Sequence, residues 1–282
     1  MFSTIPNLVS KSFGIPPTVC SISECFTSNG TWYCCPGTFC IEVVLVAGGG
    51  GGGSGVLQCS LFRVTGGAGG GAGGVQVSSL TSLIGSCANI FIGAGGAGGP
   101  DRFSNIQGFG NPGSEGGCSC FAQPFSGFPS LIVTGGQGGL GGYSDNIDVF
   151  RAGGAGGGGS QGSSPAGANI SVGCLNGQGG SQPNKPGGGG AGFSINYDAP
   201  GDVVNATPGG CASGTYGDFC GITLSDGGYG GNDFQCGSSS TGGFGGGGGG
   251  GAGYANTNPA GRGFAGGAGA PGIIKVTQYY IG

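Results

Sequence analysis

The residues of this sequence with the most obvious chemistry are thirteen cysteines. Because the chain has no histidine and no CxxC motif, the common zinc signatures are absent, and no metal site is expected. Disulfides are the favoured use of the cysteines, and buried small apolar residues are the alternative. Each bridge would contribute about 2–4 kcal/mol. The candidates for fastening the N-terminal segment to the rest are Cys20, Cys25, Cys34, Cys35 and Cys40.

Catalytic constellations are hard to build from the other side chains. Without histidine, a Ser/His/Asp or Cys/His system is impossible, and none of the three lysines lies in an SxxK context. The pair Asp145 and Asp148 and the pair Asp226 and Asp233 are close enough in sequence for paired carboxylates. Aspartate in glycine-rich loops is, however, usually a turn residue. The sequence therefore predicts a protein that is not an enzyme and needs no cofactor.

Glycine dominates the composition, with 80 residues in 282, and this excludes a helical bundle. A disordered linker is the alternative for such a chain. Disorder usually accompanies high charge and few apolar groups, whereas here 6% of residues are charged and 36% are hydrophobic. We therefore expect the apolar side chains of this chain to pack into a folded structure.

Short β-prone segments alternate with glycine tracts along the chain. The segment IEVVLVA at 41–47 runs directly into GGGGGG, and GIIKVTQYY at 272–280 ends the pattern. These two segments are expected to pair and close the domain. The tracts fit a polyglycine-II helix, whose N–H and C=O groups need partners on neighbouring helices. The predicted fold is a mainly irregular and β protein, a polyglycine-II bundle or sandwich with short strands and essentially no α-helix. It consists of an N-terminal attachment arm, 1–25, and a glycine-rich module, 26–282.

Charge and hydropathy exclude several classes of partner. The seven basic residues are scattered singly and the net charge is −4, so nucleic-acid binding is not expected. The longest apolar run is far shorter than the roughly 20 residues that a membrane span needs.

The first residues lack the apolar core of a signal peptide. A protein made in the cytosol and later exposed on a released particle would reconcile this start with the many cysteines.

The order of these segments resembles the glycine-rich domain of phage tail-fibre and other virion appendage proteins. The resemblance rests on IEVVLVAGGGGGG, ANIFIGAGGAGG, LIVTGGQGG and GGAGAPGIIKVTQYY, and it covers most of the chain. The chain is similar to the polyglycine-II adhesins of T-even-like phages, and this similarity implies that loops between the tracts bind a host-surface glycan or protein. It also implies a virion location, synthesis in the host cytoplasm, and attachment of the arm to other fibre or capsid subunits. A trimer, or a single chain on a trimeric shaft, fits the resemblance.

Loops between the tracts are rich in aromatic and amide side chains, which suit receptor recognition on a rigid scaffold. The alternative is that the aromatic residues cap the ends of the bundle. The receptor-binding candidates are Arg102, Phe103, Asn105, Tyr143, Asp145, Asn146, Tyr197, Tyr216, Tyr229, Asn232, Tyr254 and Asn256. A fibre or capsid decoration protein without receptor binding is the first alternative function, followed by an ice-binding or an extracellular matrix protein.

Overall fold

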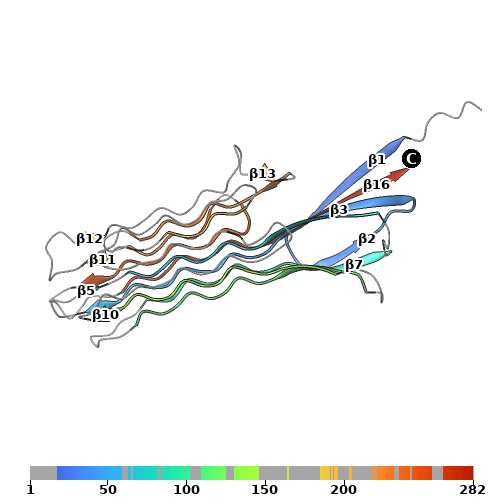
Figure 1. Ribbon diagram of the computed structural model, residues 1–282. Helices are drawn as coiled ribbons and strands as arrows, with labels where there is room; N and C mark the ends of the chain where they lie inside the picture. Colours follow the sequence, from blue (N-terminus) through green and yellow to red (C-terminus); the bar gives the residue numbers. More distant parts are fainter. Residues whose placement is uncertain are drawn as a thin grey trace, which may run out of the picture.

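The computed structural model is an elongated body with a β-sandwich at one end and a bundle of extended glycine-rich runs at the other (Figure 1). No α-helix occurs among the residues that the structure describes, so the expected fold class is confirmed. Those residues are 18–58, 63–64, 66–81, 84, 86–101, 109–124, 130–145, 164, 185–190, 192, 194–195, 203–204, 218–219, 221–231, 235–241, 243–255 and 263–281.

Two four-stranded antiparallel sheets form the sandwich. The first has the order β1 (Val19–Phe26), β16 (Ile273–Ile281), β3 (Thr38–Val46) and β6 (Val75–Leu80). The second has the order β2 (Gly30–Tyr33), β7 (Cys87–Phe91), β8 (Ser119–Ala122) and β9 (Leu131–Val133). Ile273 lies opposite Val46, so the expected pairing of the opening and closing segments is confirmed.

The remaining described strands are short and lie outside the sandwich sheets. They are β4 (Leu57–Gln58), β5 (Arg63–Val64), β10 (Ser144–Asp145), β11 (Ser194–Ile195), β12 (Val203–Val204), β13 (Asp218–Phe219), β14 (Ile222–Thr223) and β15 (Tyr254–Ala255). A small cluster of Val44, Val46, Val75, Ile222, Leu224 and Ile273 packs β14 against the first sheet on the face away from the sandwich core.

The sandwich core follows from the alternation of side chains along each strand. Trp32 and Phe121 are fully buried between the sheets, with ring centroids 5.5 Å apart. They pack with the aliphatic residues Ile41, Val43, Leu45, Ile90, Leu131, Val133, Ile274 and Val276. Burial of apolar side chains therefore holds this end of the molecule together.

The bundle begins where strands of the sandwich end. Strand β3 continues as run 48–55, β7 as run 93–100 and β9 as run 134–142. Runs that return toward the sandwich enter β6, β8 and β16; they are 66–74, 109–118 and 263–272. The chain therefore passes back and forth along the long axis of the body (Figure 1).

Run 48–55 lies at the centre of six neighbouring runs. Its successive N–H groups donate in rotation to runs 109–118, 263–272 and 66–74, with N···O distances of 2.8–3.0 Å. Its carbonyl groups accept hydrogen bonds from three further runs, which are 93–100, 134–142 and 245–253. A three-residue rotation with all bonds made laterally is the arrangement that a polyglycine-II helix requires.

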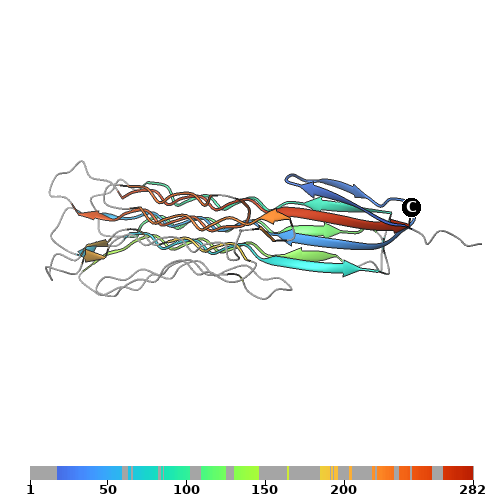
Figure 2. The ribbon, with the colours of Figure 1, turned by 90° about the horizontal axis from the view of Figure 1, so that it is seen from above.

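Run 245–253 is a second centre with six neighbours. It shares runs 48–55, 66–74 and 263–272 with the first centre, and its other partners are 186–190, 227–231 and 235–241. These adjacencies place the runs in three layers, which are visible from above (Figure 2). The middle layer contains runs 109–118, 48–55, 245–253 and 227–231.

Glycine is needed in these runs for the absence of a side chain. A Cβ built on Gly51 would lie 2.0 Å from the carbonyl oxygen of Ala97, and one on Gly52 would lie 2.1 Å from that of Gly249. Positive φ occurs at Gly37, Gly221 and Gly245, so backbone freedom does not explain the glycines of run 48–55. At these glycines the laterally bonded runs are so close together that a methyl group does not fit.

Strand pairing, and no disulfide, joins residues 19–25 of the expected arm to the module. Strand β1 pairs with β16 along its whole length, from Val19 opposite Ile281 to Phe26 opposite Ile274. Residues 1–17 lie outside the described residues. The cysteines proposed to fasten the arm, Cys20, Cys25, Cys34, Cys35 and Cys40, are all free thiols in this structure.

The strand order explains why a bridge from β1 to Cys40 is not formed. Strand β16 lies between β1 and β3, so the two backbones are about 9–10 Å apart. A disulfide joins Cα atoms that are about 4.4–6.8 Å apart. Cys20 and Cys25 therefore cannot reach Cys40 without movement of the sheet.

Candidate functional site

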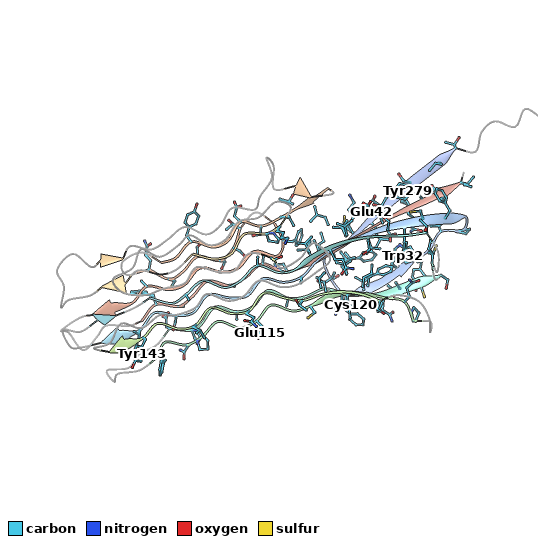
Figure 3. The ribbon with its side chains drawn as sticks, viewed as in Figure 1. Trp32, Glu42, Glu115, Cys120, Tyr143 and Tyr279 are labelled. Carbon is cyan, nitrogen blue, oxygen red and sulfur yellow. The ribbon has the colours of Figure 1, made fainter. Side chains whose placement is uncertain are left out.

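An exposed aromatic pair marks the end of the bundle far from the sandwich. Phe109 and Tyr143 form a β-bridge, and their ring centroids are 4.7 Å apart with an interplanar angle of 31°. Phe109 is 54% exposed, and Tyr143 is half-buried (Figure 3, where Tyr143 is labelled). Phe109 is the first residue of run 109–118, and Tyr143 directly follows run 134–142. These two runs are neighbours, because the N–H of Gly110 donates to the carbonyl oxygen of Gly142.

The same two runs carry a row of exposed side chains back toward the sandwich. Because the run repeats every three residues, each third side chain points to the same side. We call this row the ridge; its residue pairs are Phe109 with Tyr143, Pro112 with Leu140, Glu115 with Gln137, and Cys118 with Thr134. Two backbone hydrogen bonds fix the register of these pairs along the two runs. They join Gly113 N–H to Gly139 O at 2.9 Å and Gly116 N–H to Gly136 O at 2.8 Å.

The ridge changes character along its length. The two pairs nearest the far end are apolar, and Leu140 is 43% exposed. The third pair has a carboxylate and an amide, and the fourth has a thiol and a hydroxyl. Glu115 is the one charged residue of the ridge.

The structure brings three of the sequence-based candidates to the far end. Tyr143 belongs to the ridge, and Asp145 in β10 lies opposite Arg63 of β5 in the strand register. Tyr254 in β15 pairs with Leu57 of β4, directly after run 48–55. The other candidates at loop positions lie outside the described residues; they are Arg102, Phe103, Asn105, Asn146, Tyr197, Tyr216, Asn232 and Asn256.

Tyr229 lies on the side of the bundle and is separate from the far end. It is exposed in run 227–231, and its carbonyl oxygen is the atom nearest to a Cβ built on Gly249. The backbone N–H of Tyr229 donates to the hydroxyl of Ser238 at 2.7 Å. The structure therefore does not group Tyr229 with Tyr143.

The sequence reasoning did not identify Phe109, Pro112 and Leu140. The signal was present, because in TGGQGGLGGY a residue other than glycine occurs at every third position from Thr134 to Tyr143. In a polyglycine-II helix, such a period marks one face of the run. Buried glycines occupy the positions that face run 48–55, such as Gly136 and Gly139.

A family model described as a glycine-rich domain matches residues 26–279. The chain belongs to this glycine-rich domain family. No curated protein matches the chain.

Within this glycine-rich domain, the Cys120 thiol has little nucleophilic character. Burial, and secondly the neighbouring Cys118, raise the pKa of the Cys120 thiol, which favours its protonated form. The part of the chain that the structure describes contains no group of three or more Cys, Asp or Glu residues able to hold a metal ion. Over the same residues, no helix has the length and apolar character to cross a bilayer.

Proposed function

We propose that this glycine-rich domain is the attachment module of a virion appendage such as a phage tail fibre, and that its far end binds a receptor on the host surface. The observation that carries the proposal is that strands β1 and β16 and the exposed aromatic pair lie at opposite ends of the elongated body. Strands β1 and β16, in which Val19 lies opposite Ile281, are at the sandwich end (Figure 1), whereas Tyr143, packed against Phe109, lies at the opposite end of the bundle (Figure 3). Residues 1–25 would join the module to fibre or capsid subunits.

The bundle suits this division of roles because it is a rigid spacer. Each inner run bonds to six neighbours, so a displacement at one end requires many backbone hydrogen bonds to shift together. Binding side chains gain from such a scaffold, since less ordering entropy is lost on association. The proposed role is binding without catalysis.

Competition for host attachment tests the proposal. Purified full-length protein is added to host cells before the particles that carry it, and the rate of particle adsorption is measured. We expect a concentration-dependent decrease, with heat-denatured protein as the control. Unchanged adsorption at saturating protein would favour a purely structural decoration of the particle.

A second candidate function, ice binding, is favoured by one specific observation. Runs 93–100 and 263–272 are neighbours, and their third positions expose or partly expose Ala94, Ala97, Ala265 and Ala268. A face of small residues with regular spacing is what binding to an ice surface would need. Thermal hysteresis in a freezing-point assay would support this function, and its absence would exclude it.

A further inference from the structure

Four apolar side chains of the ridge gather in two adjacent pairs at the far end. Phe109 and Leu140 are 54% and 43% exposed, and they lie beside Tyr143 and Pro112. Successive pairs on a polyglycine-II run are about 9.3 Å apart, because three residues each rise about 3.1 Å. The result is a narrow apolar strip with a fixed repeat along the axis of the bundle.

The aromatic pair is held in place before any ligand binds. The ring centroids of Phe109 and Tyr143 are 4.7 Å apart, so the two rings are in contact. The hydrogen bond from Gly110 N–H to Gly142 O, 2.7 Å long, fixes the backbones beneath them. Rings that are already packed lose little rotamer entropy when a ligand covers their outer faces.

Polar side chains follow directly on the apolar strip. Glu115 and Gln137 form the next pair toward the sandwich, and both are exposed. Gln137 offers an amide donor and acceptor, and Glu115 offers a carboxylate acceptor. A ligand that extends along the ridge therefore meets two apolar pairs and then a hydrogen-bonding pair.

We infer that the ridge binds a neutral, linear saccharide chain lying along the bundle axis. Sugar rings have apolar C–H faces, which fit the rings of Phe109 and Tyr143, and hydroxyl edges, which fit Glu115 and Gln137. This inference rests on the proposed attachment function and names the ligand class for the same end of the molecule.

Size and charge favour this ligand over the alternatives. A stable protein interface needs about 20–30 residues a side, whereas the ridge offers eight, of which four are apolar. An anionic polymer would approach Glu115, on a chain whose net charge is −4. Like charges repel, so a neutral chain fits better than an anionic one.

Binding of defined oligosaccharides by the full-length protein tests the inference. The probes are maltohexaose, cellohexaose and chitohexaose, with a hexamer of alginate as the anionic control, and the readout is calorimetry or saturation-transfer NMR. We expect saturable binding of at least one neutral probe and none of the alginate. Binding of none of the three neutral probes, or of alginate in preference to them, would overturn the inference.

Variants assign the binding to the ridge. Phe109→Ala should weaken the affinity at least about tenfold, and Phe109→Trp should retain it. Phe91→Ala is the matched control, since Phe91 is 49% exposed but lies on β7 in the sandwich, and its affinity should stay within twofold of wild type. Unchanged melting temperatures ensure that the folded proteins are compared. Wild-type affinity in Phe109→Ala would contradict the inference.

The adsorption assay separates this inference from the proposed function. If wild-type protein and Phe109→Ala block adsorption equally, attachment stands and the saccharide assignment to the ridge fails. If wild-type protein binds a saccharide through Phe109 but does not block adsorption, the ridge assignment stands and the attachment function fails. Blocking that requires Phe109 without binding of any neutral saccharide indicates a protein receptor and overturns the saccharide assignment.

Discussion

The sandwich and the bundle are stabilised by opposite means within one chain. In the sandwich, large side chains such as Trp32 and Phe121 fill the space between two sheets. In the bundle, run 48–55 contributes almost no side-chain atoms, and its backbone groups bond to six neighbours. The same strands continue from one region into the other, so the change of mechanism occurs within a few residues, for example between Val46 and Gly48.

This difference predicts different tolerance to substitution. A sandwich core accepts other apolar side chains of similar volume at modest cost. At most glycines inside the bundle a side chain is not accepted, because a Cβ would meet the backbone of the next run, whereas Ser54, Ala68 and Ala252 are the kind of small residue that is buried there. Third positions on outer runs, by contrast, face solvent and accept many residues.

The largest effect is expected from Gly51→Ala in the central run. Its Cβ would lie 2.0 Å from the carbonyl oxygen and 2.4 Å from the carbonyl carbon of Ala97, so whole runs must separate. We expect a loss of about 5 kcal/mol or more in the free energy of unfolding, measured by urea denaturation. Gly30→Ala in β2 is the control, since its Cβ would lie 3.8 Å from the nearest atom. Equal stability of the two variants would refute the close packing.

Phe121→Ala should be the next most destabilising change. The side chain is fully buried against Trp32, and its removal leaves a cavity in the sandwich core. We expect a loss of about 3–5 kcal/mol. Trp32 is the single tryptophan, so its fluorescence reports on the sandwich during unfolding. Phe91→Ala, on the exposed face of β7, should cost little, and a comparable loss there would contradict the assignment of the core.

A smaller effect is expected from Ser119→Ala, at the junction of the two regions. Its buried hydroxyl donates to the carbonyl oxygen of Val46 at 2.8 Å and accepts from the N–H of Gly93 at 3.0 Å. Removal leaves both backbone groups without this partner, which should cost about 1–3 kcal/mol in thermal or urea unfolding. Ser23→Ala removes an exposed hydroxyl contact to Thr277 and serves as the control. A larger loss in Ser23→Ala would argue against a structural role of the junction.

The smallest effect is expected from Ala97→Ser on an outer run. Ala97 is exposed, and a hydroxyl there points to solvent, so the stability should change by less than about 0.5 kcal/mol. One residue earlier, a Cβ on Gly96 would lie 2.1 Å from the carbonyl oxygen of Ser114. Gly96→Ser should therefore unfold at a much lower temperature. Similar melting temperatures for the two variants would show that the three-residue period does not govern exposure.

The sequence predicted the closing pair of strands and the backbone-bonded bundle, because β-branched runs and dense glycine tracts each permit few structures. It did not predict β1, since VCSISECF is mostly exposed and is ordered by its pairing with β16. Which runs are neighbours could not be predicted either. Gly48, Gly49 and Gly50 are identical in type but bond to Gly117, Ala270 and Gly71 in three distant segments. The ridge was not predicted, because the three-residue period of its side chains was not interpreted as one exposed face of a polyglycine-II run.

Amide hydrogen exchange of residues 48–55 tests the central claim most directly. This run is neither helix nor strand, and every N–H in it donates to a carbonyl oxygen of another run. We expect protection of these amides comparable to that of β3, measured by mass spectrometry or NMR on the full-length protein. Exchange of residues 48–55 at the rate of an unstructured chain, with β3 still protected, would contradict the lateral bonding of the bundle.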